Sequence, residues 1–191
     1  MGKTLEEIIK SRPDKRVNGG ASCVWKLKHL YAICDKLKPS LIIESGSFTG
    51  NSLWLFKQQN PDSELHSYEI NYAGLNWRDK SIGYHNYDIQ RDIDKYSPKA
   101  NDLIYFDDHI NQEKRLKWAY KVGFKHVMFD DNVPTDKLHH FGMPATPTIS
   151  MLDEAGKIPD YVESFEILPY DGSNPEGRNG GENYLTYLKI K

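Results

Sequence analysis

Apolar positions near the start of the chain recur at steps of three and four residues, the spacing of a helix with one buried face. The residues that share this face are Val24, Leu27, Leu30, Tyr31 and Cys34. We therefore predict a long helix over residues 22–38, which ends before Pro39. A shorter helix is predicted at Leu5–Ser11. Together these two helices are expected to form an N-terminal cover over residues 1–40.

Beyond residue 40, short apolar runs alternate with helical stretches. Strands are predicted at residues 41–43, 65–70, 84–89, 103–106 and 126–129. Helices are predicted at residues 51–59 and 112–122, the second with Gly123 as its left-handed C-terminal cap. The inward residues of the second helix are expected to be Leu116, Ala119 and Tyr120. Strands that alternate with helices are typical of a mainly parallel sheet joined by right-handed crossovers.

The end of the chain follows a different pattern. Two strand-like runs, Tyr161–Leu168 and Asn183–Ile190, are separated by a segment rich in glycine and asparagine that is too polar for a helix. This predicts an antiparallel hairpin at one edge of the sheet, with Phe165 and Leu188 buried and the connection at 169–182 mobile.

The region before this hairpin, residues 133–160, contains several prolines and is expected to be a long loop with a poorly formed helix. Such a loop is a plausible lid over an acceptor. The fold class is therefore α/β: a Rossmann-like, doubly wound, mainly parallel sheet with a C-terminal antiparallel hairpin. We expect one domain over residues 1–191, with its α/β core at 41–191.

Composition narrows the function classes. The 191 residues carry 25 basic and 27 acidic side chains, a net charge of −2, so no basic field favours nucleic acid. No apolar run approaches the ~18 residues of a membrane span, and no signal peptide is visible, so a cytoplasmic location is expected. Cys23 and Cys34 lie too far apart in one helix for a disulfide and are expected to be buried free thiols. Nothing indicates the oligomeric state.

The most informative local motif joins the first predicted strand to the next helix, with Glu44, Gly46 and Gly50 in a Glu-x-Gly-x-x-x-Gly spacing. Gly46 permits a sharp turn and close approach of a ligand, and Gly50 precedes the free N–H groups of the helix. Glu44 disfavours a phosphate and suits a cationic ligand. The alternative is a tight strand–helix turn that binds nothing.

Acidic residues follow one predicted strand after another. They are Glu44, Glu69, Asp88, Asp107 and Asp131. Glu69 comes 23 positions after Gly46 at a strand end, where an acid typically accepts hydrogen bonds from ribose hydroxyls. Asp88 is placed to accept from an adenine amino group. The alternatives are a surface glutamate and a turn aspartate.

The sequence resembles class I S-adenosylmethionine-dependent methyltransferases over residues 22–191. LIIESGSFTGNS resembles their first motif, HSYEI the second with its ribose acid, and YDIQ the third. The resemblance implies S-adenosylmethionine as cofactor, with its methionine part held near Glu44, Gly46 and Gly50, its ribose at Glu69 and its adenine at Asp88. The implied cofactor-binding residues are Glu44, Gly46, Ser47, Gly50, Ser52, Glu69, Asp88 and Asp107.

A narrower resemblance is to small O-methyltransferases. DLIYFDDH and HVMFDDNV are similar to the catechol-type pattern, which implies Asp107, Asp131 and Asn132 as ligands of a divalent cation such as Mg²⁺. The lysine base of that pattern is replaced by Ile110. His109 is our candidate base, with Asp107 as a second catalytic residue. DDH also resembles the Asp-x-x-His stretch of sugar and macrolide O-methyltransferases, one residue shorter.

The alternative interpretation of these acids is structural: Asp108 caps the following helix, and Asn132 lies in a turn before Pro134. Other residues noted for chemistry have equally simple interpretations. Adjacent histidines on a loop, such as His139 and His140, are more often solvated than ligating, and Trp54 or Trp77 is a candidate to stack on the adenine or acceptor. The basic residues of the helix at 112–122 are expected to form its solvated face. They are Lys114, Arg115, Lys117 and Lys121.

The resemblance implies methyl transfer to an oxygen of a small-molecule acceptor, such as a sugar or another polyol. Two alternatives from other classes stay open. One is a binding module with this fold that holds the nucleotide or a partner without turnover. The other is a different nucleotide-using α/β enzyme, such as one acting on sugar nucleotides, which Glu44 argues against.

Overall fold

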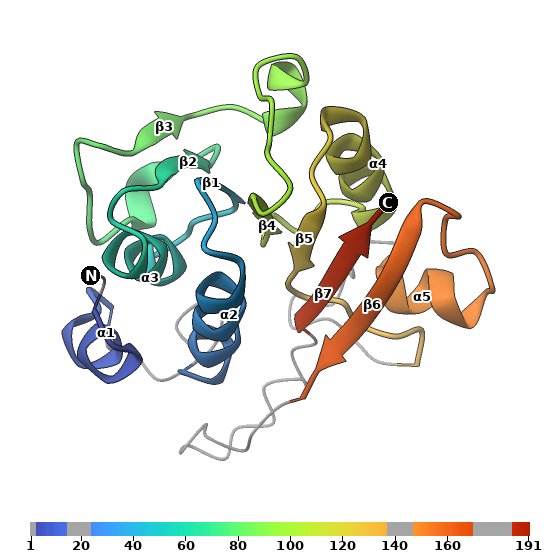
Figure 1. Cartoon of the computed structure of the whole chain (residues 1–191), viewed down its shortest axis with the longest axis horizontal. Helices are drawn as coiled ribbons and strands as arrows, with labels where there is room; N and C mark the ends of the chain where they lie inside the picture. The colour runs from blue at the N-terminus through green and yellow to red at the C-terminus, as the bar shows by residue number, and fades with distance from the viewer. Residues whose placement is uncertain (1–2, 15–23, 137–146, 170–184) are drawn as a thin grey trace.

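The structure is a computed structural model that describes residues 3–14, 24–136, 147–169 and 185–191 (Figure 1). Within these residues, one mixed sheet has the strand order β3-β2-β1-β4-β5-β7-β6. The strands are β1 (Leu41–Ser45), β2 (Glu64–Tyr68), β3 (Gly83–His85), β4 (Leu103–Phe106), β5 (His126–Phe129), β6 (Val162–Leu168) and β7 (Leu185–Ile190). The first five run parallel, and β7 is antiparallel to both β5 and β6. The predicted doubly wound sheet with a terminal hairpin is confirmed.

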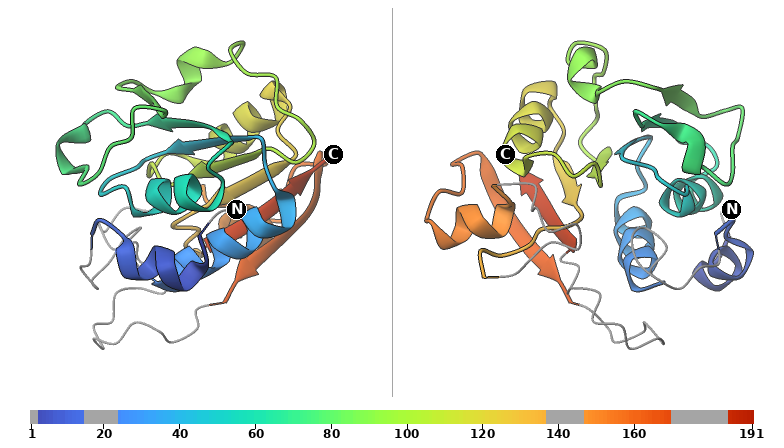
Figure 2. Two further views of the ribbon diagram at one scale, coloured as in Figure 1. Left: turned by 60° about the vertical axis from the view of Figure 1, so that its left-hand side comes forward. Right: turned by 180° about the vertical axis from the view of Figure 1, so that it is seen from behind.

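Helices cover both faces of the sheet (Figure 2). They are α1 (Leu5–Ser11), α2 (Val24–Leu37), α3 (Asn51–Gln59), α4 (Gln112–Val122) and α5 (Ile149–Glu154), with short 3-10 helices η2 (Tyr72–Gly74) and η3 (Ile89–Asp92). One core lies between the sheet and α1, α2 and α3, and a second lies between the sheet and α4 and α5. The N-terminal helices thus share one core and one layer with α3.

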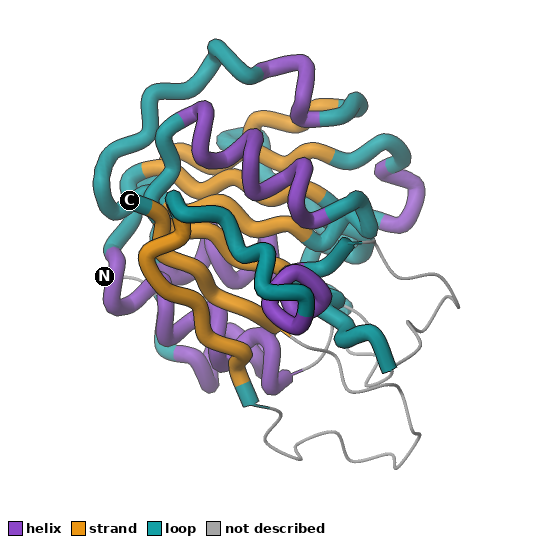
Figure 3. The backbone as a smooth tube through the Cα atoms, turned by 90° about the vertical axis from the view of Figure 1, so that its right-hand side faces the viewer, coloured by secondary structure: helices purple, strands orange, loops and turns teal. Residues whose placement is uncertain are grey.

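The register aligns the carboxyl ends of four parallel strands. Ser45 pairs with Tyr68 on one side and with Phe106 on the other, and Phe106 pairs with Phe129. The residues that follow these strands therefore lie along one edge of the sheet. Figure 3 shows the strands lying side by side in this sheet. This alignment follows from short buried strands of similar length joined by crossovers.

Most predicted elements match the structure closely, and the differences lie at polar positions. The second strand begins at Glu64 and ends at Tyr68, two residues before the predicted end, although the Glu69 N–H still donates to the His85 carbonyl of β3 at 3.0 Å. The third strand, predicted as 84–89, covers only Gly83–His85, and Ile89 begins a 3-10 helix. The long helix spans Val24–Leu37, and its predicted face is buried or half-buried.

One prediction about the helices in the second half of the chain is wrong, and another agrees with the structure. The described part of residues 133–160 contains one short helix, α5, in keeping with the poorly formed helix expected there; the Thr148 hydroxyl caps its N-terminus by accepting from the Met151 N–H. Tyr120 on α4 is 44% exposed and stacks on Tyr161 with ring centroids 4.2 Å apart, so it lies outside the core. Trp118 takes the inward position instead, because the buried face of α4 is rotated from the predicted one.

The hairpin prediction is confirmed where it is described. Phe165 of β6 pairs with Leu188 of β7; Leu188 is buried and Phe165 is half-buried. The prediction for 169–182 falls almost entirely on residues outside the described ranges, and so does the one for Cys23. Cys34 is buried and free. No helix in the described ranges combines the length and the apolar character needed to cross a membrane.

Candidate functional site

The loop between β1 and α3 is shaped by two glycines with positive φ. Gly46 has φ +90°, and a Cβ there would lie 2.2 Å from the Asp107 carbonyl oxygen. Its N–H donates to the Tyr68 carbonyl at 2.8 Å. Gly50 has φ +85°, and a Cβ there would lie 2.6 Å from Leu75 Cδ1. Gly46 is therefore required by close packing against the backbone at Asp107, and Gly50 is favoured by its positive φ, because the Leu75 side chain could shift. Both reasons differ from the close ligand approach that the motif suggested.

Glu44 lies beneath this loop and is completely buried. Its Oε2 accepts from the Ser47 hydroxyl at 3.1 Å, and its Oε1 accepts a short hydrogen bond from the Ser52 hydroxyl. Burial raises the pKa of Glu44 to about 8, against the lowering effect of the two serine hydroxyls. Glu44, Ser47 and Ser52 thus form one polar unit that holds the loop against the start of α3.

Glu69 follows β2 and reaches back to the same loop. Its Oε2 accepts from the N–H groups of Ser47 at 3.2 Å and Phe48 at 3.3 Å. Its Oε1 accepts from the Asn71 N–H at 3.2 Å. The carboxylate is half-buried, so it stays within reach of a ligand while it closes the loop.

Two apolar side chains beside Glu69 were missed by the sequence reasoning. Phe48 is 57% exposed and Ile70 is 80% exposed. Their exposure could have been predicted from their positions next to polar motif residues at the ends of strands, where an apolar side chain does not face the core. They give the loop an exposed apolar surface at the carboxyl ends of β1 and β2.

Asp88 lies three residues beyond β3 and is occupied by internal contacts. It caps η3 through the Gln90 N–H. Its two oxygens accept from the Arg115 guanidinium at 2.9 and 3.0 Å, and this pairing lowers the pKa of Asp88. The side chain is 43% exposed, so one edge remains open to solvent.

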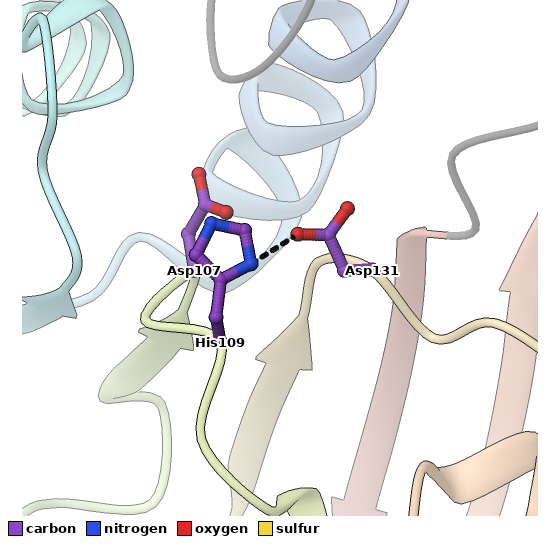
Figure 4. Close-up of side chains that lie close together, drawn as sticks. All are labelled: Asp107, His109 and Asp131. Carbon is purple, nitrogen blue, oxygen red and sulfur yellow. Dashed lines mark ion pairs between the residues drawn. The ribbon is translucent and has the colours of Figure 1, made fainter. Parts of the chain in front are cut away.

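At the ends of β4 and β5 the structure brings together Asp107, His109 and Asp131 (Figure 4). One potential ligand atom from each lies within 4.8 Å of the others. His109 Nδ1 is 3.0 Å from Asp131 Oδ2. His109 and Asp131 have φ values of +54° and +53°, strained for residues with side chains. Strain of this kind clusters at functional sites.

The charges at this point act on one another. The hydrogen bond that His109 donates to Asp131 raises the pKa of His109 despite partial burial. Burial and the neighbouring Asp130 raise the pKa of Asp107 well above its usual range. Among the described residues, no ion pair or hydrogen bond reaches the Asp107 carboxylate, so it is available to a ligand.

Asn132, the third predicted metal ligand, is completely buried and turned into the fold. Its Oδ1 accepts from the Ser150 N–H at 2.6 Å, and its Nδ2 donates to the Thr186 hydroxyl. Asn132 therefore ties α5 and β7 to the end of β5. The structure places Asp107 and Asp131 together with His109, while the amide of Asn132 serves a structural contact.

The interpretation of Asp108 as a helix cap is wrong, and so is the solvated-face interpretation of Arg115. Asn111 caps α4, accepting from the Lys114 N–H at 2.9 Å. Asp108 instead accepts from the Ser45 hydroxyl at 2.5 Å and pairs with Arg115 at 2.8 Å. The Arg115 side chain is only 2% exposed, and its guanidinium bridges Asp88 and Asp108.

Trp54 and Trp77, noted as possible stacking residues, contact each other edge to face at 4.9 Å and pack against the first core. His139 and His140 lie outside the described residues.

Solved structures of O-methyltransferases share this fold with the chain. TomG, an O-methyltransferase from Streptomyces achromogenes crystallised with SAM, matches with TM-score 0.65 and 16% identity, covering 100% of this chain and 92% of its own. The O-methyltransferase from Bacillus cereus in complex with SAH matches with TM-score 0.63 and 18% identity, covering 98% and 90%. No protein-family model matches the sequence, and no curated protein is similar enough in sequence to match it.

Proposed function

We propose that this protein is an S-adenosylmethionine-dependent methyltransferase that acts on an oxygen of a small hydroxylated acceptor such as a sugar. The observation that carries the proposal is the convergence of the Gly46–Gly50 loop, Glu69 and the Asp107–His109–Asp131 group at one sheet edge, in a fold whose solved examples hold SAM or SAH. The Asp107–His109–Asp131 group at the ends of β4 and β5 supports an oxygen acceptor, because it offers a base for a hydroxyl proton.

The cofactor residues follow from the geometry of the loop. Glu69 offers a half-buried carboxylate for ribose hydroxyls while its other contacts fix the loop backbone. Ile70, exposed beside it, offers an apolar face for the adenine ring. Glu44 acts indirectly: through Ser47 and Ser52 it holds the loop that would receive the methionine part. Asp88 lies further along the same edge, with one side toward solvent.

His109 is the proposed base. The methyl group passes from the sulfonium to the acceptor oxygen in an in-line displacement, and the hydroxyl proton must leave that oxygen. Asp131 holds the Nδ1 side of the imidazole at 3.0 Å, in the way a carboxylate orients a catalytic histidine, which leaves Nε2 for the proton. Asp107 lies close to both His109 and Asp131, and its carboxyl group acts electrostatically on the reacting groups.

The resemblance to catechol-type O-methyltransferases implies a divalent cation at this position, and the residues fit one in part. Asp107 and Asp131 present hard oxygen ligands near each other, as Mg²⁺ prefers. The Asn132 oxygen already accepts a backbone hydrogen bond, and His109 lies where a third ligand is needed. A bound cation would lower the pKa of the acceptor hydroxyl. We propose Asp107 and Asp131 as its ligands, with Asn132 the weakest member of the predicted set.

Two measurements test the proposal. S-adenosylhomocysteine at 100 times its dissociation constant should stabilise the protein by about 2.7 kcal/mol, whereas NAD and UDP should not. Transfer of labelled methyl groups to a panel of sugars and polyols should then identify an acceptor. Cofactor binding without transfer to any acceptor would favour the binding-module alternative, and stabilisation by NAD or UDP alone would reject the proposal.

With an acceptor in hand, His109→Gln should lower turnover about 10²–10⁴-fold while S-adenosylhomocysteine still binds. Glu113→Gln, an exposed acid on α4, is the matched control and should leave turnover unchanged. The role of a cation is tested by measuring turnover in excess chelator and again after Mg²⁺ is added. Turnover that persists in chelator would show that the reaction needs no divalent cation.

A further inference from the structure

A buried lysine from the N-terminal cover lies beneath the candidate site. Lys26 on α2 is 1% exposed, and its ammonium forms an ion pair with Asp130, whose side chain is also inaccessible. The two residues are separated by 104 positions in the sequence. An ammonium group buried in this way is costly unless it is paired, so the pair is a specific feature of the fold.

Asp130 is fully occupied by contacts that lead to the site. Its Oδ2 accepts from Lys26 and from the Tyr105 hydroxyl at 3.3 Å, and its Oδ1 accepts from the Asp131 N–H at 2.8 Å. The last bond fixes the backbone of Asp131, which carries the strained φ and faces His109. Lys26 is therefore connected to the site through Asp130, which contacts both Lys26 and the Asp131 backbone.

Three of the acids at the ends of β4 and β5 are paired with basic side chains. Arg115 pairs with Asp108, Lys26 with Asp130 and His109, which is a cation only when protonated, with Asp131. For Asp107 the described residues provide no ion pair. The charges of Asp130, Asp107 and Asp131 act together on Lys26 and outweigh the effect of burial, so the pKa of Lys26 is raised and its charge is permanent.

We propose that Lys26 is a built-in counter-cation of the site. Its ammonium, which comes from the N-terminal cover, neutralises the charge of Asp130, so that no divalent cation is needed to do so. One negative charge is thereby removed from the surroundings of Asp107 and Asp131, and the affinity of this rim for divalent cations is held down. The inference concerns metal binding alone, so it stands independently of methyl transfer.

The test is calorimetric titration of the protein with Mn²⁺, without cofactor or acceptor. Lys26→Met leaves the Asp130 charge uncompensated and should bind Mn²⁺ at least about tenfold more tightly than the wild type, since two unit charges a few ångströms apart attract strongly in a protein interior. Lys26→Arg should behave as the wild type. The double variant Lys26→Met/Asp130→Asn removes both charges and should return the affinity to the wild-type value.

The single variant is expected to be unstable, and the design allows for this. If Lys26→Met is unfolded by circular dichroism, Mn²⁺ should restore its fold, while the double variant should fold without metal. The proposal is overturned if the single variant binds Mn²⁺ no more tightly than the double variant, or if it stays unfolded in Mn²⁺. Failure of the methyltransferase assignment would show instead in the S-adenosylhomocysteine stabilisation, which these titrations do not use.

Discussion

Two groups of buried acids lie at the same sheet edge, and their charges are balanced in different ways. At the end of β1, Glu44 is surrounded by serine hydroxyls, and the pKa of about 8 keeps it largely protonated at neutral pH. At the ends of β4 and β5, Asp108 faces Arg115 and Asp130 faces Lys26. Glu44 is balanced by a proton, whereas these two aspartates are balanced by fixed cations.

Because of this difference, one region is expected to be sensitive to pH and the other to the removal of a charged partner. A proton is gained or lost with pH, so the β1 end responds to pH through Glu44. A lysine or arginine keeps its charge at all ordinary pH values, so the β4 and β5 ends respond to removal of a partner. The first region holds the loop proposed for the cofactor and the second holds the proposed base, so cofactor binding and catalysis can be perturbed independently.

The strongest test acts where the two regions touch. Gly46→Ala places a methyl group 2.2 Å from the Asp107 carbonyl oxygen at φ +90°. Crowding and backbone strain together should lower the free energy of unfolding by about 4 kcal/mol, measured by urea denaturation. Gly156→Ala, with φ +64° and no atom within 4 Å of the added Cβ, is the control for strain alone and should cost about 1 kcal/mol. Equal losses in the two variants would show that the contact with Asp107 is not limiting.

Arg115→Met tests the fixed cations. The substitution leaves Asp108 and Asp88 without their partner and should lower the free energy of unfolding by about 3 kcal/mol, less if water reaches the more exposed Asp88. Lys114→Met, on the exposed face of the same helix, should change it by less than about 0.5 kcal/mol. Similar small effects of both substitutions would mean that Arg115 is not a structural charge.

Glu44→Gln tests the proton. The folded-state pKa of about 8 exceeds the ordinary value of 4.5, so between these values the folded protein holds a proton that the unfolded chain releases. Stability therefore falls as pH rises through this window, by up to about 1.4 kcal/mol per pH unit, and levels off above it. Over pH 6 to 7.5 Glu44 should account for about 2 kcal/mol of the stability that the wild type loses in urea denaturation.

In Glu44→Gln this loss should disappear, because the amide does not titrate. Glu6→Gln, an exposed acid on α1, is the control and should keep the wild-type slope. Parallel curves for the Glu44 variant and the wild type would mean that Glu44 is ionised in the folded protein, and the contrast between the two regions would be lost.

The smallest expected effect concerns the helix that carries Arg115. Asn111→Ala removes the side chain that accepts from the Lys114 N–H at the start of α4 and should cost about 1 kcal/mol of stability. Asn111→Ser keeps an oxygen acceptor and should restore most of it. A loss much larger than this in the alanine variant would show that the first turn of α4, and not the ion pair, positions Arg115.

The sequence was sufficient for the strands and helices whose apolar pattern is unbroken, such as 103–106 and 112–122, because burial on one face leaves little choice of structure. It was insufficient where a polar residue is buried by a distant partner. Arg115 was assigned to solvent and Lys26 was not noticed, because their partners Asp108 and Asp130 come close only in the folded chain.

The candidate site shows the same division. The acids at strand ends were found because a parallel sheet brings its carboxyl ends together. The direction in which each side chain turns was not predictable: Asn132 faces α5, while His109 turns to Asp131. Those choices depend on α5 and on backbone strain at single residues, which no local pattern records.

The pairing of Lys26 with Asp130 also sets an order in time. At roughly 5–20 residues per second, synthesis of Asp130 follows that of Lys26 by about 5–20 s, since 104 positions separate them. Until β5 leaves the ribosome the lysine has no buried partner, and its ammonium must remain hydrated. The N-terminal helix that is made early is thus expected to dock late, when the end of the fifth strand arrives to receive it.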